Sequence, residues 1–158
     1  MSEVNKIEYI DLKTASNREE LIKSIVDLSI LNFSSPSKNE NFTEYLSDEN
    51  YILRVLLKEG QLIGYIIAKK IFDEAEIYEI AISPNFQNQG HGSHLLKKLI
   101  EELFNSEINS ILLEVRENNT NAINLYEKYN FKTYLVRKNY YGNINALCMK
   151  LERSEYEY

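Results

Sequence analysis

A polar loop with two glycines, FQNQGHGS (Phe86–Ser93), has a composition suited to binding an anion. It lies between an apolar run that ends at Ile82 and a helical pattern that begins near His91. The first N–H groups of a helix have no partner within the helix, and the helix dipole adds positive potential at that end. Glycine permits positive φ and lets the backbone approach a ligand closely. The loop therefore predicts a phosphate cradle, although a tight strand–helix connection without a ligand is the alternative from spacing alone.

Two other phosphate-binding motifs and a zinc site do not fit this stretch. A dinucleotide-binding loop would place a third glycine three residues after Gly92, where Leu95 stands, and a P-loop would contain Gly-Lys-Ser/Thr. His91 and His94 lack the third nearby ligand that a zinc pattern needs. We therefore expect no metal, and we expect the two histidines to be exposed polar residues.

Hydrophobic periodicity indicates the elements that must position this loop. The expected helices begin at Asn17, where Glu20 completes a capping box, at the glycine loop, and at Asn121, with Asn130 as a left-handed cap after the last one. The segment 33–42 is rich in Ser, Asn and Pro and is expected to be a loop. The expected strands are residues 7–12, 51–58, 61–72, 75–82, 110–116, 131–138 and 144–152.

This order of strands and helices predicts an α+β fold with mixed strand pairing. A chain of 158 residues has the length of one domain, which we assign to residues 1–152, and an acidic, tyrosine-rich tail at residues 153–158 is open to being ordered or disordered. The N-terminus resembles neither a signal nor a transit peptide, and no apolar run reaches the about 20 residues of a membrane span. The net charge of −6 argues against nucleic-acid binding, and the single cysteine, Cys148, excludes an internal disulfide. We expect a cytoplasmic protein that binds neither membrane nor nucleic acid.

Three stretches of the second half of the chain carry a family resemblance. The first, IAISPNFQNQGHGSHLLKKLI, resembles the signature of the GNAT acyltransferase superfamily, whose Q/R-x-x-G-x-G/A loop holds the pyrophosphate of acetyl-CoA. The others, ILLEVRENNTNAINLYEKYNF and RKNYY, resemble the RimI-type enzymes, which acetylate the N-terminal alanine of a small-subunit ribosomal protein. The resemblance implies a GNAT-like fold, in which a mixed, mostly antiparallel sheet of about seven strands lies between helices as a three-layer α/β/α sandwich. It also implies acetyl-CoA as the cosubstrate.

The same resemblance implies roles for individual residues. The strand before the loop would pair its backbone with the pantetheine arm, and Asn119 stands where the family has a pantetheine-contacting asparagine. Tyr126 stands where the family has the tyrosine that protonates the leaving thiolate. Tyr140 and Tyr141 are expected to flank the acceptor, or else to be exposed beside a hairpin turn at Gly142–Asn143. The residues implied to bind the cosubstrate are Ile80, Ala81, Ile82, Gln87, Asn88, Gln89, Gly90, His91, Gly92, Ser93, Asn119 and Tyr126.

Three glutamates are candidates for the base that takes the proton of the amine. Glu114 matches the glutamate of the RimI-type enzymes, and Glu76 lies where histone-type relatives carry theirs. Regular alternation would place Glu76 and Glu79 on opposite faces of one strand, so at most one would face the cleft. Glu79 is expected to bind substrate, and each of the three is open to being only a solvated strand residue. An α-amine has a pKa of about 7.7–8.0 against about 10.4 for lysine, so an N-terminal acceptor demands less of the base.

The predicted function is direct transfer of acetyl from acetyl-CoA to a primary amine, first of all the N-terminal alanine of a ribosomal protein. A GNAT enzyme for a small amine, a polyamine or another protein is the alternative, because the segment after the paired tyrosines is short and the chain contains no Trp. A degenerate member that only binds acyl-CoA is the alternative that is not an enzyme.

Overall fold

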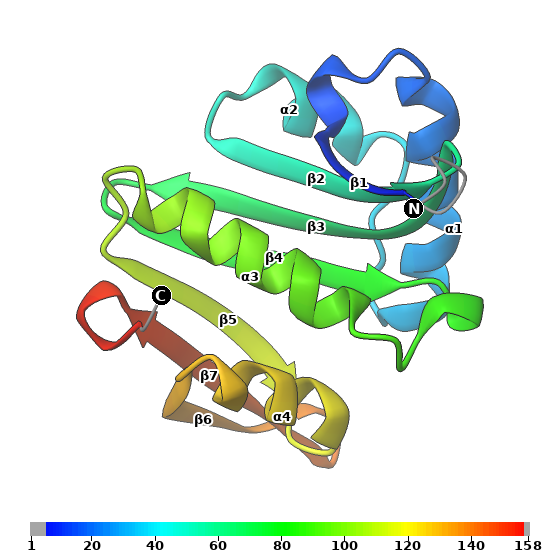
Figure 1. Cartoon of the computed structure of the whole chain (residues 1–158). Helices are drawn as coiled ribbons and strands as arrows, with labels where there is room; N and C mark the ends of the chain where they lie inside the picture. Colours follow the sequence, from blue (N-terminus) through cyan, green and yellow to red (C-terminus); the bar gives the residue numbers. More distant parts are fainter. Residues whose placement is uncertain (1–5, 157–158) are drawn as a thin grey trace.

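The computed structural model describes residues 6–156. Within them, seven strands form one sheet in the order β1-β2-β3-β4-β5-β7-β6, and helices cover both faces (Figure 1). The strands are β1 (Ile7–Asp11), β2 (Tyr51–Lys58), β3 (Gln61–Ile71), β4 (Glu74–Ile82), β5 (Ser110–Arg116), β6 (Lys132–Tyr141) and β7 (Ile144–Glu152). The helices are α1 (Arg18–Asn32), α2 (Asn41–Ser47), α3 (His91–Phe104) and α4 (Thr120–Lys128), with 3-10 turns at Leu12–Thr14, Pro84–Phe86 and Arg153–Glu155.

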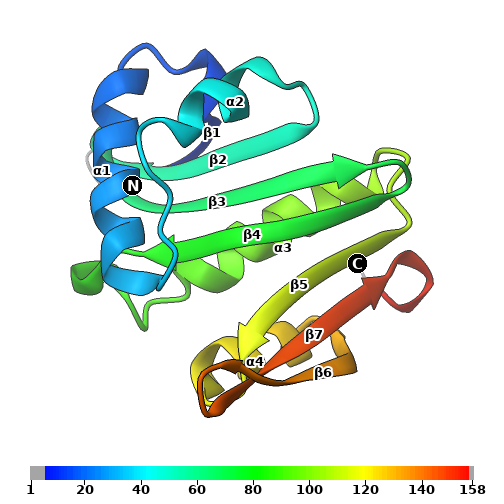
Figure 2. The ribbon, with the colours of Figure 1, turned by 180° about the vertical axis from the view of Figure 1, so that it is seen from behind.

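The pairing between β4 and β5 positions the functional site. All other neighbouring strands of the described sheet are antiparallel, whereas β4 and β5 are parallel and pair only from Glu74↔Ser110 to Ile77↔Leu113. Beyond Ile77 the two strands diverge, as both ribbon views show (Figures 1 and 2). The last five residues of β4 therefore have no strand on their β5 side.

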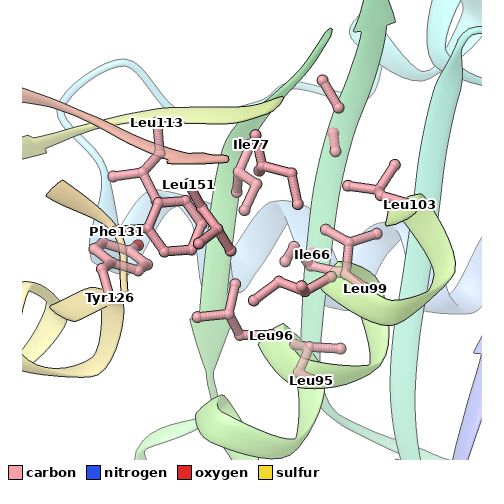
Figure 3. Close-up of a cluster of buried hydrophobic side chains, with 14 of the residues drawn as sticks. Ile66, Ile77, Leu95, Leu96, Leu99, Leu103, Leu113, Tyr126, Phe131 and Leu151 are labelled. Atoms are coloured by element: carbon pink, nitrogen blue, oxygen red, sulfur yellow. The ribbon is translucent and has the colours of Figure 1, made fainter. Parts of the chain in front are cut away.

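The sheet separates two apolar cores. On one face, α3 packs an unbroken apolar stripe that includes Leu95, Leu99 and Leu103 against Ile66 and Ile77 (Figure 3). On the other face, α1 and α2 cover β2 and β3, with Ile25 and Phe42 in that core. Each fully buried side chain of this size contributes about 1.5–3 kcal/mol, so the two cores stabilise the sheet from both faces. The predicted α/β/α sandwich is confirmed.

Two helix features in the N-terminal half differ from expectation. Residues 41–47 form the short helix α2, so the expectation of a loop over 33–42 is wrong at its last two residues; only Phe42 of this helix is fully buried, which leaves little apolar periodicity to indicate it. Asn17 is the N-cap of α1 as expected, but its side chain makes no capping hydrogen bond, so the predicted capping box does not form. The left-handed conformation expected of Asn130 is present, with φ of 72°.

The start of the C-terminal tail is folded. Tyr156 is buried, and its ring lies 5.7 Å from that of Phe104 on α3. Arg153 donates from Nε to the Ile108 carbonyl at 2.9 Å. The tail is thus ordered through Tyr156, and its last two residues, like the N-terminal residues 1–5, lie outside the described part. No helix in the described part is long and apolar enough to cross a membrane.

Candidate active site

A cleft of about 770 Å³ opens where β4 and β5 diverge. Its walls come from β4, the loop before α3 and the start of that helix, the second half of β5, α4, the segment after α1, α2, and the β6–β7 hairpin. The site is therefore built from residues on both sides of the gap in the sheet.

The glycine loop and the first turn of α3 form one end of this cleft. Gly90 is the N-cap of α3 with φ of 84°, and Asn88 also has positive φ. No side chain caps the helix, and the N–H of His94 is the one that bonds to the Gly90 carbonyl, at 3.0 Å. The N–H groups before it have no helical acceptor, so this end can receive an anion. Ala in place of Gly92 would make only ordinary contacts, at 3.7 Å from Leu125, so packing alone does not require a glycine there.

The side chains of the loop hold the loop itself. Gln87 donates to the Ile82 carbonyl at 3.0 Å, and Gln89 donates to the Asn85 carbonyl at 3.2 Å. The Ser93 hydroxyl forms a hydrogen bond with the Tyr129 hydroxyl and accepts another from the Lys128 ammonium at 3.1 Å. Backbone amides therefore remain available to contact a ligand, and Asn88 also lines the cleft.

The end of β4 offers an unpaired backbone edge to the cleft. Ile80, Ala81 and Ile82 pair with β3 on one side and have no strand on the other. Their side chains are committed to packing, Ala81 toward α1 and the two isoleucines toward α3. An extended ligand with amide groups can bond to such an edge as an added strand would.

A β-bulge in β4 changes which glutamates reach the cleft. Ile67 pairs with Glu79 and Ala68 with Ile77, so Tyr78 is an extra residue in the strand. As a result, Glu76 and Glu79 lie on the same face and both line the cleft, and the expectation that at most one does so is wrong. The sequence carried a signal of the bulge, because the apolar residues Ile77 and Ile80 are three positions apart and regular alternation would put them on opposite faces. In the structure both pack into the same core.

Glu114 lies on β5, bonded to the β6–β7 hairpin. Its Oε1 is 3.2 Å from Nε of Arg137, and its Oε2 accepts from the Tyr141 hydroxyl at 3.3 Å. The side chain of Glu76 makes no hydrogen bond or ion pair within residues 6–156. Partial burial, together with the charge of Glu114, raises the pKa of Glu76, while Arg137 opposes that rise. Of these two carboxylates in the cleft, Glu114 is paired with a cation and Glu76 is not.

Tyr126 lies on α4 with its ring 5.8 Å from that of Phe131 (Figure 3). Burial raises the pKa of Tyr126 to about 12. The Tyr126 hydroxyl has no hydrogen-bond partner in the described part of the chain. Since every fully buried polar side-chain atom there has a partner, this hydroxyl is not fully buried. Tyr126 lines the cleft, so its hydroxyl reaches the cleft. Asn119, the N-cap of α4, accepts from the Ala122 N–H at 3.2 Å and also lines the cleft.

The paired tyrosines form the outer wall. Tyr140 and Tyr141 contact each other edge to face at 5.1 Å, and the Arg116 guanidinium lies 4.3 Å from the Tyr141 ring. Gly142, with φ of 68°, makes the expected turn between β6 and β7. The tyrosines border the expected turn and line the cleft, and their contact with the acceptor stays a prediction.

The structure also brings to the cleft residues that the sequence did not indicate. Phe33, from the segment after α1, and Tyr45, from α2, line the cleft. Arg137 is not among the lining residues, but it pairs with Glu114, which is. Arg137 was within the quoted RKNYY stretch, but its partner is 23 residues away in the chain and no local pattern indicates it. Among the described residues, no three His, Cys, Asp or Glu are grouped to hold a metal ion.

The fold, the loop at the start of α3 and the gap beside β4 define an acyltransferase. The profile of the acetyltransferase (GNAT) family matches residues 19–131, and the chain belongs to this family. It is an N-acetyltransferase, an enzyme that transfers acetyl from acetyl-CoA to an amine.

Individual members of the family resemble this chain in sequence and in structure. The [ribosomal protein bS18]-alanine N-acetyltransferase of Haemophilus influenzae is 42% identical over 106 residues, which are 64% of this chain and 72% of that protein. The crystal structure of the ribosomal-protein-S18-alanine N-acetyltransferase from Escherichia coli superposes with a TM-score of 0.80 at 28% identity, over 93% of this chain and 94% of that one. A GNAT acetyltransferase from Elizabethkingia anophelis with acetyl-CoA bound shares the fold, with a TM-score of 0.70 at 24% identity over 96% and 99% of the two chains.

Proposed function

We propose that this enzyme acetylates the N-terminal alanine of ribosomal protein bS18. The observation that carries the proposal is the convergence, in one cleft, of the α3 loop, the unpaired edge of β4, Glu114 and Tyr126. Relatives that act on bS18 support the choice of acceptor. An acceptor on the ribosome would place the enzyme in the cytoplasm.

Acetyl-CoA is assigned to the gap between β4 and β5. The amides from Gln87 to Ser93 would bind the pyrophosphate, and Lys128, beside Ser93, adds a positive charge near that end. The pantetheine arm would extend along Ile80–Ile82, with Asn119 opposite. This arrangement directs the thioester toward the part of the cleft that Glu114 and Tyr126 share.

In the proposed reaction, Glu114 accepts a proton from the acceptor α-ammonium, directly or through water, and the amine attacks the thioester carbon. A C–N bond forms and the C–S bond breaks, and the second proton that the attacking nitrogen loses is transferred through water to the leaving thiolate, which gives the free thiol. Moving a proton fully from a phenol of pKa about 12 to a thiolate whose acid has a pKa of about 8.5 costs about 5 kcal/mol. Tyr126 therefore acts chiefly as a hydrogen-bond donor to the leaving sulfur.

Glu76 is a second candidate for the base. Its unpaired carboxylate and raised pKa suit proton acceptance, whereas the Glu114 carboxylate is already paired with Arg137. We rank Glu114 first because it lies on the same side of the gap as Tyr141 and Tyr126.

The test is release of free thiol from acetyl-CoA with a panel of acceptors at equal concentration. The panel holds peptides with the bS18 N-terminus, the same peptides beginning with residues other than Ala, peptides with only a lysine amine, and polyamines. Turnover confined to the Ala-initiated bS18 peptide is expected. Faster turnover on a polyamine or a lysine side chain would reject this acceptor and keep the family chemistry.

A further inference from the structure

A buried carboxylate below the acceptor side of the cleft has three hydroxyl partners and no cation. Glu79 is 8% exposed, and its Oε1 accepts from Ser29 at 2.7 Å and from Tyr65 at 2.6 Å, while its Oε2 accepts from the Ser37 hydroxyl. No Lys or Arg of the described chain forms an ion pair with it. We call these four residues the Glu79 cluster.

The Glu79 cluster joins four separate parts of the chain. Glu79 comes from β4, Tyr65 from β3, Ser29 from α1, and Ser37 from the segment between α1 and α2. The bulge at Tyr78 turns Glu79 toward α1, because in a regular strand it would point into the α3 core. Burying an ionised carboxylate is costly unless its oxygens are hydrogen-bonded, and here hydroxyl donors supply that compensation.

The segment that Glu79 holds has few other attachments. Residues 34–37 make no backbone–backbone hydrogen bond to the rest of the described chain. Ser37 instead donates its N–H to the Ser29 hydroxyl at 2.8 Å and its own hydroxyl to Glu79. The preceding residues Ser34 and Ser35 line the cleft, and Tyr45, which also lines it, has its hydroxyl 3.5 Å from that of Ser37.

We infer that Glu79 is a positioning residue of the acceptor site, which fixes the wall formed by residues 32–35 through Ser29 and Ser37. Every hydrogen bond of the Glu79 side chain in the described chain goes to another residue of the protein, which favours this role over the expected direct binding of substrate. The inference rests on the proposed function, in that this side of the cleft is taken to receive the acceptor amine.

The hydrogen-bond directions lead to a sharp test. Ser29 accepts from the Ser37 N–H, so it must donate to Glu79, and Tyr65 donates as well. In a Glu79→Gln variant, the amide oxygen can still accept from both, and the amide N–H can donate to Ser37. Gln thus keeps the geometry and removes only the charge, whereas Glu79→Ala and Ser37→Ala break the attachment of the segment.

The experiment measures KM for the acceptor peptide, KM for acetyl-CoA, and kcat, together with hydrogen exchange of the amide of residue 37, which donates to Ser29. We expect Ser37→Ala, which loses one hydrogen bond to a charged group, to raise the acceptor KM about tenfold, and Glu79→Ala, which loses three, to raise it at least as much, with the other two constants changed less than about twofold. Glu79→Gln should restore the acceptor KM to within about threefold of the parent enzyme. Exchange should be faster in Ser37→Ala and unchanged in Glu79→Gln. Ser47→Ala, an exposed serine on α2, is the matched control.

The opposite pattern would overturn the inference. If Glu79→Gln were as impaired as Glu79→Ala while Ser37→Ala behaved as the parent, the charge of Glu79 would act on the acceptor directly. Unchanged exchange in Ser37→Ala would mean that other contacts fix the segment. If the parent enzyme acetylated no member of the panel, the proposed function would fail, and hydrogen exchange would still decide whether Glu79 positions the wall.

Discussion

Glu114 on β5 and Arg137 on β6 form an ion pair, with 3.2 Å between Oε1 and Nε, that joins the candidate base to the hairpin carrying the paired tyrosines. The two residues are not on neighbouring strands, because β7 lies between β5 and β6. The pair therefore spans a strand on the open face of the sheet. Any change in the hairpin is expected to reach the base through this contact.

Glu114→Gln is expected to lower kcat by about 10²- to 10⁴-fold at pH 7, because the amide cannot accept the proton of the amine. Affinity for acetyl-CoA, measured by calorimetry, should be unchanged. Glu76→Gln is the matched control and should lower kcat by less than about tenfold. A larger loss in Glu76→Gln than in Glu114→Gln would make Glu76 the base.

Tyr126→Phe is expected to lower kcat by about 100-fold, through loss of the hydrogen bond to the leaving sulfur. The same variant tests the buried phenol at high pH. The folded pKa of about 12 lies above the ordinary value of 10.0, so the related stability is fully present below pH 10 and is lost as pH rises toward 12. The parent enzyme should thus lose about 3 kcal/mol more than Tyr126→Phe across that range in urea unfolding. Equal losses in the two proteins would show that this phenol is not buried as described.

Gly64→Ala is expected to destabilise the fold by about 1–3 kcal/mol. A Cβ at Gly64 would stand 2.5 Å from Cδ1 of Ile82 and 3.0 Å from the Ala81 carbonyl, at the point where β3 supports the cleft edge. Ile82→Val removes that Cδ1, so the double variant should be less destabilised than the sum of the single ones in denaturant unfolding. Additive effects would contradict the close approach.

Gly92→Ala separates folding from binding. Because the added Cβ meets only ordinary contacts at 3.7 and 3.8 Å, and because Ala favours a helix, stability should stay the same or rise by up to about 1 kcal/mol. Affinity for acetyl-CoA should fall at least about tenfold if the ligand approaches this backbone closely. An unchanged affinity would move the phosphate contacts to other amides of the loop.

The sequence predicted those parts of the site that depend on local chemistry. The glycine loop at Gly90, the start of α3 and the turn at Gly142 each follow from residue types within a few positions, and the structure has all three. The bulge at Tyr78 was not predicted, so regular alternation put Glu76 and Glu79 on opposite faces, whereas the structure places both on one face, in the cleft lining. The pairing of Arg137 with Glu114 was not predictable, since it depends on which strands become neighbours and on side-chain direction across a third strand.

The short pairing of β4 with β5 has a mechanical consequence. Within the described residues, four residue pairs at one end join the half of the sheet made by β1 to β4 to the half made by β5, β7 and β6. The opposite end of that seam has no strand-to-strand contact, so the two halves of the sheet are connected as by a hinge near Ile77 and Leu113. A ligand that lies along β4 and also touches α4 and β5 would connect the two halves at the open end. We therefore expect occupancy by acetyl-CoA to stiffen the whole enzyme, including the hairpin that meets the acceptor.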